Sequence, residues 1–248
     1  MVANMPLNRL KVLVTRPEQQ AKNLCEMIAA SGGQSIAFPV IEIVPIDKQK
    51  WPEFALAEQD MIIFVSRNAV ANFINVIKQA IPEQIQLVSV GAGSAASMRE
   101  HGLRVDIQPN QSIGSEGLLL MPEFDDMAGK NVLIIRGKGG RELLADTLVQ
   151  RGAVVRYLEV YERTLPNPSL LLREQALTAE CIVCTSVEGV KNLTKLLQKG
   201  LKTLLDKPML VVSERIKVVA ESLGFQRIIV TTNVSDEATL EQLIKLER

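Results

Sequence analysis

The 248-residue chain carries the same sequence pattern twice, and this internal duplication limits the folds that it can adopt. When the chain is shifted by 120 residues, VLVTRPEQQAKNLCEMIAASGG, from Val12, aligns with VLIIRGKGGRELLADTLVQRGA, from Val132. The same shift aligns 60–66 with 180–186, and after a two-residue insertion the match continues at a shift of 122. Several matched positions are glycines and helix starts at element boundaries. The sequence therefore contains two structurally equivalent copies.

Each copy alternates short apolar runs with amphipathic helical stretches. The runs rich in β-branched residues are predicted strands, at 11–15, 35–38, 61–65, 87–90, 105–107, 132–135, 154–157, 182–185, 209–212 and 228–230. Stretches such as 18–30 and 141–151 are predicted helices between them. This alternation is typical of parallel sheets with helices on both faces. We therefore predict an α/β protein with two five-stranded, doubly wound, flavodoxin-like parallel sheets related by the duplication.

Two extended segments interrupt the alternation at equivalent positions of the two copies. Residues 39–45 and 158–165 each follow a predicted strand directly, are bounded by proline and have no helix behind them. We interpret them as linker strands between two domains. The repeat alone does not show whether the chain crosses from one domain to the other there.

Composition excludes several classes of protein. The 28 basic and 28 acidic side chains balance, so the chain lacks the basic excess of a nucleic-acid binder. No apolar run reaches the ~18–20 residues of a membrane span, and the N-terminus lacks the apolar core of a signal peptide. We expect a cytoplasmic protein with no membrane partner. The single histidine, His101, precedes Gly102 and is predicted to end a helix, so neither a zinc site nor a Ser-His-Asp triad is expected.

Cys181 and Cys184 have the CxxC spacing, but they lie in a predicted strand. Residues i and i+3 of a strand point to opposite faces, so we expect two buried cysteines that do not meet.

Polar residues and glycines follow the predicted strands of both copies. Open parallel sheets bind ligands at this carboxyl edge, where helix N-termini present free amides and arginines pair with carboxylates or phosphates. The predicted binding residues are Arg16, Ser66, Arg67, Asn68, Gly91, Arg136, Lys138, Gly139, Arg141, Ser186, Val187 and Ser213. This set favours a small polyanionic ligand. For the three serines, helix capping without ligand contact is an equally good explanation.

Support for a nucleotide-binding motif in the sequence is weak. The GxGxxA pattern from Gly91 follows a late strand, and its repeat mate from Ser213 lacks the glycines. No phosphate-loop pattern GxxxxGK[ST] occurs. Two other classes stay open at this point: a two-domain protein that binds an anionic metabolite without chemistry, and a nucleotide-dependent oxidoreductase.

Several segments carry motifs in a recognisable order: 12–17, 64–70, Ile135-Arg-Gly-Lys-Gly-Gly-Arg-Glu-Leu-Leu144, Arg151-Gly-Ala153, Val160-Tyr-Glu-Arg163 and 210–215. Each motif is weak alone, but the ordered set covers nearly the whole chain. It resembles the uroporphyrinogen-III synthase family, especially its bacterial branch.

The resemblance implies two α/β domains, 1–38 plus 166–248 and 46–157, joined by the linker strands 39–45 and 158–165. It also implies a lyase without cofactor or metal, acting on the carboxylate-rich linear tetrapyrrole hydroxymethylbilane in a cleft between domains. Ring A would lose its hydroxyl to give an azafulvene cation. Ring D would attack through its substituted α-carbon, and a spiro intermediate would fragment and reclose with ring D inverted.

The same resemblance makes Tyr161 the expected acid toward the leaving hydroxyl. Its repeat mate is Ile41, so the site would be asymmetric on a duplicated scaffold. The alternative, that Tyr161 only packs the linker strands, stays open. The resemblance further implies a monomer, with transient hand-over of the bilane from the preceding pathway enzyme.

Overall fold

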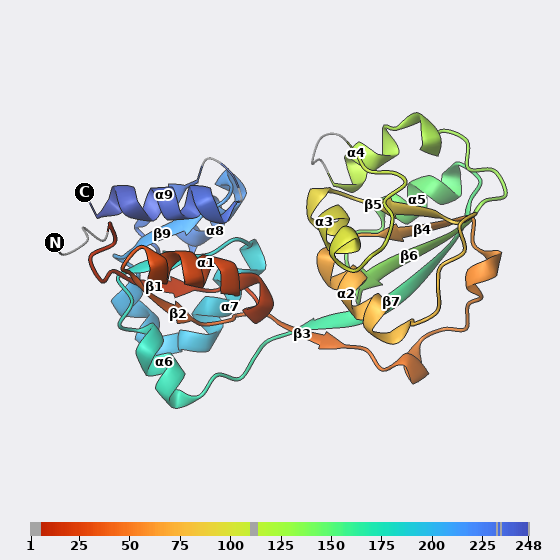
Figure 1. Cartoon of the computed structure of the whole chain (residues 1–248). Coiled ribbons are helices and arrows are strands. Elements are labelled where there is room, and N and C mark those ends of the chain that lie inside the picture. The colour runs from red at the N-terminus through yellow and green to blue at the C-terminus, as the bar shows by residue number, and fades with distance from the viewer. Residues whose placement is uncertain (1–5, 110–113, 232, 234, 248) are drawn as a thin grey trace. The chain divides into compact units, whose positions relative to one another are not determined.

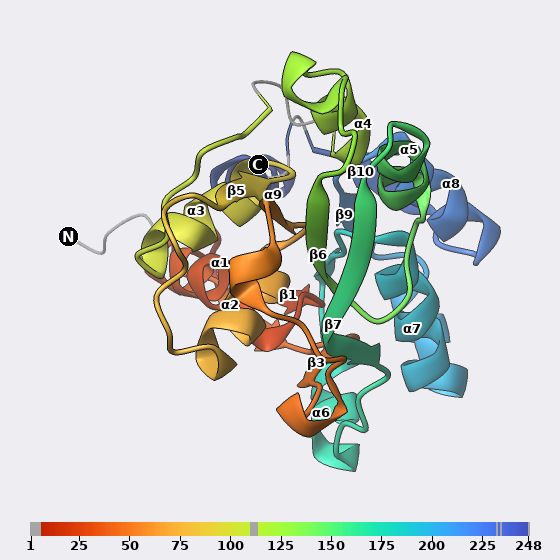
Figure 2. The same ribbon diagram turned by 90° about the vertical axis from the view of Figure 1, so that its right-hand side faces the viewer.

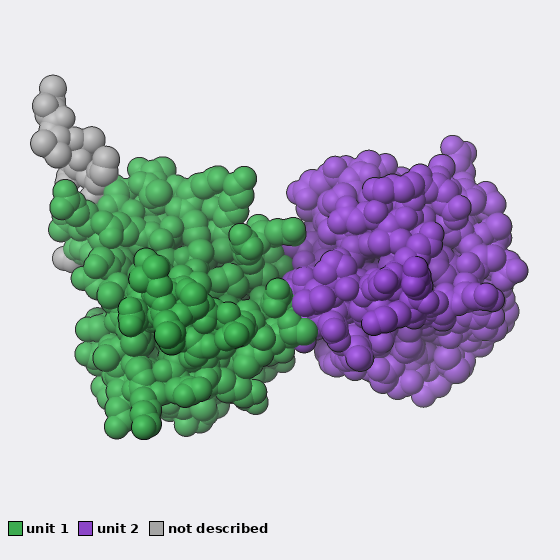
Figure 3. Space-filling view, turned by 90° about the horizontal axis from the view of Figure 1, so that it is seen from below, with its two compact units in different colours: residues 1–42, 164–248 green, residues 43–163 purple. Residues whose placement is uncertain are grey.

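The computed structural model describes residues 6–109, 114–231, 233 and 235–247. The chain forms two compact units, coloured separately in Figure 3. Unit 1 comprises residues 1–42 and 164–248, and unit 2 comprises residues 43–163. The chain therefore enters unit 2 once and leaves it once. Both crossing points lie within the segments 39–45 and 158–165 that the sequence marks as linkers.

Unit 1 contains a five-stranded sheet in the order β10-β9-β8-β1-β2, in which every neighbouring pair is parallel. Figure 1 labels β1, β2 and β9 of this sheet. Its strands are β1 (Lys11–Val14), β2 (Gln34–Ala37), β8 (Cys181–Val183), β9 (Pro208–Val211) and β10 (Arg227–Val230). Its helices are α1 (Glu18–Ala30), α6 (Leu170–Ala176), α7 (Val187–Leu197), α8 (Glu214–Ser222) and α9 (Asp236–Leu246), with a 3-10 segment at Gln198–Leu204.

One face of this sheet is covered by α1 and α9. Val12 and Val14 of β1 point to that face and pack with Leu24 of α1 and Leu243 of α9, all fully buried. Because alternate residues of a strand point to opposite faces, Leu13 is buried on the other side. Burial on both faces explains why β1 is an unbroken apolar run.

Unit 2 contains the second five-stranded sheet, in the order β3-β7-β6-β4-β5. Its strands are β3 (Glu42–Pro45), β4 (Met61–Phe64), β5 (Gln86–Ser89), β6 (Asn131–Gly137) and β7 (Val154–Thr164). Its helices are α2 (Arg67–Val76), α3 (Ala92–Glu100), α4 (Ser115–Leu119) and α5 (Leu143–Gln150), with 3-10 turns at Lys48–Lys50, Leu56–Glu58 and Pro122–Phe124. The pairs from β7 through β5 are parallel, and β6 and β7 run side by side in Figure 2.

Helices cover both faces of this sheet as well. Val132 and Ile134 of β6 pack toward Leu144 of α5, whereas Leu133 and Ile135 pack with the α2 residues on the opposite side. The structure confirms the predicted α/β class with two doubly wound parallel sheets. Among the described residues, no helix combines the length and apolarity needed to cross a membrane.

Each sheet draws strands from both copies of the duplicated sequence. Unit 1 joins β1 and β2 of the first copy to β8, β9 and β10 of the second, and unit 2 joins β4 and β5 of the first to β6 and β7 of the second. The crossing points lie inside the copies, so each unit is made of complementary parts of the two.

Two details of the expected strands were wrong. Segment 105–107 is not a strand and contributes only a bridge between Val88 and Ile107, because the Asp106 carboxylate accepts the Leu87 amide hydrogen at 2.7 Å and competes with regular pairing. The fifth strand of the unit 2 sheet is instead β3. The predicted strand 154–157 and the predicted linker 158–165 are one continuous strand, β7, paired on both edges.

Candidate active site

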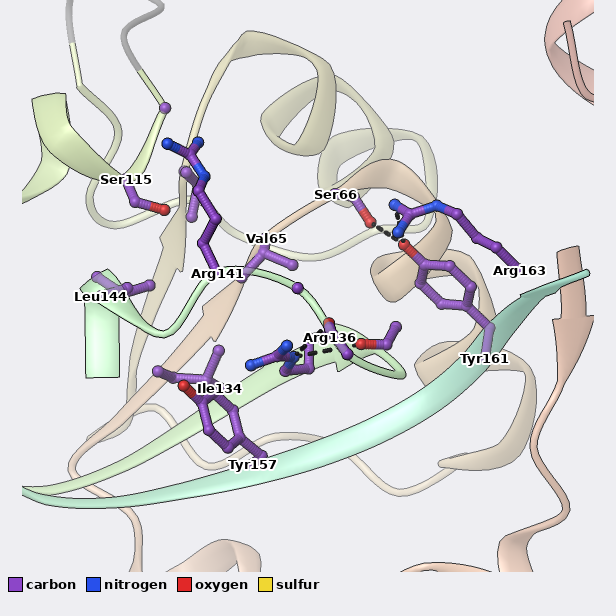
Figure 4. A pocket seen from close by; sticks show the side chains of 15 residues that line it. Val65, Ser66, Ser115, Ile134, Arg136, Arg141, Leu144, Tyr157, Tyr161 and Arg163 are labelled. Atoms are coloured by element: carbon purple, nitrogen blue, oxygen red, sulfur yellow. Dashed lines mark hydrogen bonds between the residues drawn. The ribbon is translucent and has the colours of Figure 1, made fainter. Parts of the chain in front are cut away.

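A pocket of about 260 Å³ lies within unit 2, where β4 and β6 end and β7 passes beside them (Figure 4). Five predicted site residues line it, namely Ser66, Arg136, Gly139, Arg141 and Tyr161. Residues that the sequence analysis did not select also line it, among them Ser115, Gly137, Gly140, Tyr157 and Arg163. The pocket thus occupies the carboxyl edge of the sheet, as expected for an open parallel sheet.

The Tyr161 hydroxyl reaches this pocket although the side chain as a whole is only 1% exposed. Its Oη lies 3.2 Å from the Ser66 Oγ and accepts a hydrogen bond of 3.1 Å from the Arg163 Nη2. Figure 4 shows the hydroxyl between these two side chains. Tyr161 therefore presents one polar atom from an otherwise apolar environment.

A β-bulge in β7 orients Tyr161. Arg136 of β6 pairs with Glu159, but Gly137 pairs with Tyr161, so Val160 is an extra residue on β7. Without it, alternation would place Tyr161 on the same face as Tyr157, which packs toward α5. Instead Tyr161 belongs to the hydrophobic cluster on the opposite face of the sheet, which contains the buried residues of α2. Bulges commonly redirect a side chain beside an active site.

Gly137 permits the close approach of the Tyr161 ring. A Cβ atom at position 137 would lie 2.5 Å from the Tyr161 Cζ, which is far inside van der Waals contact. The next residue, Lys138, donates its amide hydrogen to the Tyr161 carbonyl at 2.7 Å. The end of β6 and the middle of β7 are thus fixed together around the tyrosine.

Arg136 is a nearly buried cation that shapes the following glycine loop. Its Nε donates to the carbonyl oxygens of Gly137, at 3.2 Å, and Gly139, at 3.1 Å, and its Nη1 donates to the Glu142 Oε1 at 3.2 Å. The guanidinium also lies over the Tyr157 ring, 4.3 Å from its centroid. Arg136 therefore holds the loop and Tyr157 as one cluster.

Gly139 and Gly140 have φ values of 71° and 118°, a region in which residues with a Cβ are strained. A Cβ at Gly140 would also lie only 3.0 Å from the Arg136 Nη2. Both glycines are therefore needed for the loop to fold around the guanidinium.

Tyr157 donates its hydroxyl hydrogen to the Glu142 carboxylate. Burial, and secondly this hydrogen bond, raise the pKa of Tyr157 to about 12. The hydrogen bond from Tyr157, and then that from Arg136, hold the pKa of Glu142 below its ordinary value. The cluster at neutral pH is a protonated tyrosine, an ionised glutamate and a guanidinium.

Besides Arg136, which pairs with Glu142, three more of the predicted anion-binding groups contact glutamates of unit 2. The Gly139 amide donates to the Glu159 Oε1 at 3.0 Å, the Lys138 Nζ lies 3.6 Å from the Glu162 Oε2, and Arg141 pairs with Glu116. Lys138 and Arg141 have well-exposed side chains. A bound anion would replace these internal carboxylates.

Four predicted residues of unit 2 lie at helix starts, and of these only Ser66 also lines the pocket, whereas Arg67, Asn68 and Gly91 are outside its lining. Ser66 caps α2 by accepting the Ala69 amide hydrogen at 3.1 Å, and Arg67 and Asn68 form the first turn of that helix. Gly91 precedes α3, and its amide hydrogen bonds to the Ser94 Oγ at 3.3 Å.

Four predicted site residues belong to unit 1. Arg16 forms an ion pair with Asp236, and its Nη2 is buried without a hydrogen-bond partner among the described residues. Ser186 caps α7, in which Val187 is the first residue, by accepting the Gly189 amide hydrogen at 2.9 Å. Ser213 precedes α8 and makes no side-chain cap. Capping thus accounts for Ser186 but not for Ser213.

Comparison with known proteins identifies the family. A family model described as uroporphyrinogen-III synthase HemD matches residues 22–245. The uroporphyrinogen-III synthases of Escherichia coli K12 and Salmonella typhimurium LT2 are 33% and 32% identical to this chain, over 94% of it and 100% of each relative. The chain belongs to the uroporphyrinogen-III synthase family. The solved uroporphyrinogen-III synthetase of Helicobacter pylori 26695 has the same fold, with a TM-score of 0.66 at 16% identity over 96% of this chain and 99% of that one.

Membership of the synthase family confirms the resemblance seen in the ordered motifs. Arg163 belongs to the motif Val160-Tyr-Glu-Arg163 but was not among the predicted site residues. A signal was available, since residues i and i+2 of a strand share a face and Arg163 follows Tyr161 by two. Tyr157 offered no comparable signal, because its role depends on Arg136 and Glu142 from other segments.

Proposed function

We propose that this chain catalyses the family reaction: it closes hydroxymethylbilane to uroporphyrinogen III with loss of water and inversion of ring D, in tetrapyrrole biosynthesis. The observation that carries the proposal is the place of Tyr161, whose side chain lines an arginine-rich pocket at the carboxyl edge of the unit 2 sheet. A nearly buried ring whose one polar atom is hydrogen-bonded beside a pocket suits an acid that meets the substrate at one atom.

In the proposed first step, Tyr161 gives its proton to the hydroxyl on ring A. The carbon–oxygen bond breaks, water leaves, and ring A becomes an azafulvene cation. The substituted α-carbon of ring D attacks this cation to form a spiro intermediate, which fragments and recloses at the other α-carbon. The proton that ring D sheds on closure restores the tyrosine, so the net change is the loss of one water.

Orientation is the larger part of the task, because the unassisted bilane closes without inversion. Three arginines, Arg136, Arg141 and Arg163, bring positive charge to the pocket lining. We propose that substrate carboxylates take the place of Glu116 on Arg141 and of Glu159 on the Gly139 amide. The other proposed substrate contacts are Arg16, Ser66, Arg67, Asn68, Gly91, Lys138, Ser186, Val187 and Ser213.

The instability of the substrate bears on its delivery. Since free bilane cyclises to the wrong isomer, a short transit from the enzyme that makes it limits this loss. We therefore extend the proposal to a transient hand-over from the preceding enzyme, in the cytoplasm.

The test is a coupled assay. Hydroxymethylbilane is generated in situ, this protein is added, and the oxidised uroporphyrin isomers are separated by chromatography. We expect a large shift from isomer I to isomer III. Isomer I alone, from protein with a cooperative thermal transition, would contradict the proposal and favour a binding protein without chemistry.

Tyr161→Phe separates the acid role from packing. The phenyl ring still fills the space against Gly137, so we expect the variant to fold and to keep forming isomer III. Turnover should fall on the order of 100-fold or more, as is usual when a positioned acid is removed. An unchanged rate would show that Tyr161 only packs β7.

A further inference from the structure

We infer that Arg163 is a positioning residue for Tyr161: together with Ser66 it holds the tyrosine hydroxyl as a hydrogen-bond donor toward the pocket. The inference rests on the proposed function, in which Tyr161 is the acid. It adds a residue to that site and assigns the direction of the hydrogen bonds around the reacting proton.

The Arg163 side chain contacts both the ring and the hydroxyl of Tyr161. Arg163 and Tyr161 are two positions apart on β7 and share a face of the strand. The guanidinium carbon lies 5.5 Å from the centroid of the Tyr161 ring, and the Nη2 reaches the hydroxyl oxygen at 3.1 Å. Although the Arg163 side chain is largely exposed, it ends at the one polar atom of a buried residue.

Counting donors and acceptors fixes what the hydroxyl can do. A phenolic oxygen has one hydrogen to donate and two lone pairs to accept with. A guanidinium has only donors, so Arg163 must occupy one lone pair of the Tyr161 oxygen. The Tyr161 hydroxyl therefore accepts on the side of Arg163 and cannot donate its hydrogen there.

Ser66 completes the arrangement. Its Oγ accepts the Ala69 amide hydrogen as the cap of α2, and its own hydrogen remains to be donated. The Tyr161 oxygen lies 3.2 Å away, and we assign it as the acceptor of that hydrogen. In this assignment Arg163 and Ser66 both donate to the Tyr161 oxygen, and the phenolic hydrogen is directed to a ligand in the pocket.

The positive charge of Arg163 also favours proton donation by Tyr161. When Tyr161 gives up its proton, a negative charge develops on the oxygen that the guanidinium contacts. A donor already in place stabilises that charge without reorganisation. Arg163 should therefore affect the chemical step more than substrate binding.

The experiment is a double-mutant cycle on isomer III formation. Arg163→Met removes both the donor and the charge, Arg163→Lys keeps both, and each is made in the native chain and in Tyr161→Phe. We expect Arg163→Met to lower kcat about 10-fold or more with KM changed less than about 3-fold, and Arg163→Lys to recover part of the loss. In Tyr161→Phe, Arg163→Met should change kcat by less than about 2-fold.

The control is Arg156→Met, which removes an exposed arginine from the same strand, away from the pocket lining, and should leave kcat unchanged. If Arg163→Met lowered kcat equally in the native chain and in Tyr161→Phe, this inference would be overturned. A rise in KM with kcat unchanged would also overturn it. In either case Arg163 would be an independent substrate contact. If the unaltered chain forms isomer III but the effects of Arg163→Met and Tyr161→Phe are additive, the proposed function still holds and only this inference fails. Isomer I alone from the unaltered chain overturns both.

Discussion

Tyr161 and Gly137 fit together with no space for another carbon atom. Gly137→Ala would place a Cβ 2.5 Å from the Tyr161 Cζ. Backbone hydrogen bonds between β6 and β7 keep the two strands from moving apart to relieve this contact. We expect the variant to lose about 1–3 kcal/mol of the free energy of unfolding, as overpacked sites do, and to lose most of its turnover. Urea unfolding and the isomer assay measure the two effects.

Gly93→Ala is the matched control for Gly137→Ala. Gly93 lies inside α3, and its added Cβ would meet only the Arg67 guanidinium group, at ordinary distances of 3.6 Å to Nη2 and 3.9 Å to Nε. Alanine is the better helix former by about 1 kcal/mol, so this variant should be slightly more stable and equally active. If Gly137→Ala also kept full activity, the tight packing on Tyr161 would have no role in catalysis.

The raised pKa of Tyr157 predicts a loss of stability in alkali. The unfolded chain releases this proton near pH 10, whereas the folded chain keeps it to about pH 12. Between these values the folded state binds more protons, so the free energy of unfolding falls as pH rises. Because Tyr157 is partly exposed, the slope should be well below ~1.4 kcal/mol per pH unit.

Tyr157→Phe isolates this contribution. It keeps the ring under Arg136 and removes the titrating group, so the fall in stability from pH 10 to 12 should become shallower. Urea midpoints across this range measure it. Parallel pH profiles for the two proteins would show that Tyr157 titrates alike in the folded and unfolded states.

At the residue scale, the sequence predicted the polar site residues that directly follow a strand. Ser66 and Arg136 line the pocket because each lies at the carboxyl end of a strand in unit 2, whereas Tyr161, inside β7, was expected only from the family resemblance. What could not be predicted is pairing over long sequence distances. No pattern shows that Arg141 meets Glu116, or that the Tyr157 hydroxyl meets Glu142.

At the scale of elements, β7 differs most from expectation. Its valines, tyrosines and threonine favour a strand throughout, but proline-bounded ends and the missing helix suggested a separate linker. Pairing with β3 on one edge and β6 on the other makes the strand continuous. Its bulge at Val160 depends on register with β6, which a single strand's sequence does not encode.

Helix α2 gives a prediction at this scale, because its cap has two roles. Ser66→Ala removes the bond to the Ala69 amide and the contact with Tyr161. Ser169→Ala removes only the cap of α6. Each should lower the free energy of unfolding by about 1 kcal/mol, but only Ser66→Ala should lower turnover. Equal turnover in both variants would limit Ser66 to capping.

At the scale of the whole molecule, the exchange of strands between copies predicts how fragments behave. Residues 43–163 contain β4, β5, β6 and β7 with their helices, so this fragment should unfold cooperatively by itself. A fragment of similar length, 1–125, holds β1 and β2 without β8, and β4 and β5 without β6. We expect no cooperative transition from it in circular dichroism.

Mixing 1–125 with 126–248 supplies every strand of both sheets. The mixture should regain a cooperative transition and form isomer III in the coupled assay. If 1–125 folded cooperatively alone, the partition of strands between the units would not govern folding.

The same partition of strands bears on how such a chain could have arisen. A single ancestral copy would have carried both halves of a sheet on either side of its linker strand, yet here neither copy completes a sheet with its own strands. Two identical ancestral subunits that exchanged halves across their linkers would have had the pairing seen today. Fusing their genes end to end would join the subunits without changing a single strand contact. One half of the former homodimer could then acquire a tyrosine where the other keeps isoleucine, as at Tyr161 and Ile41.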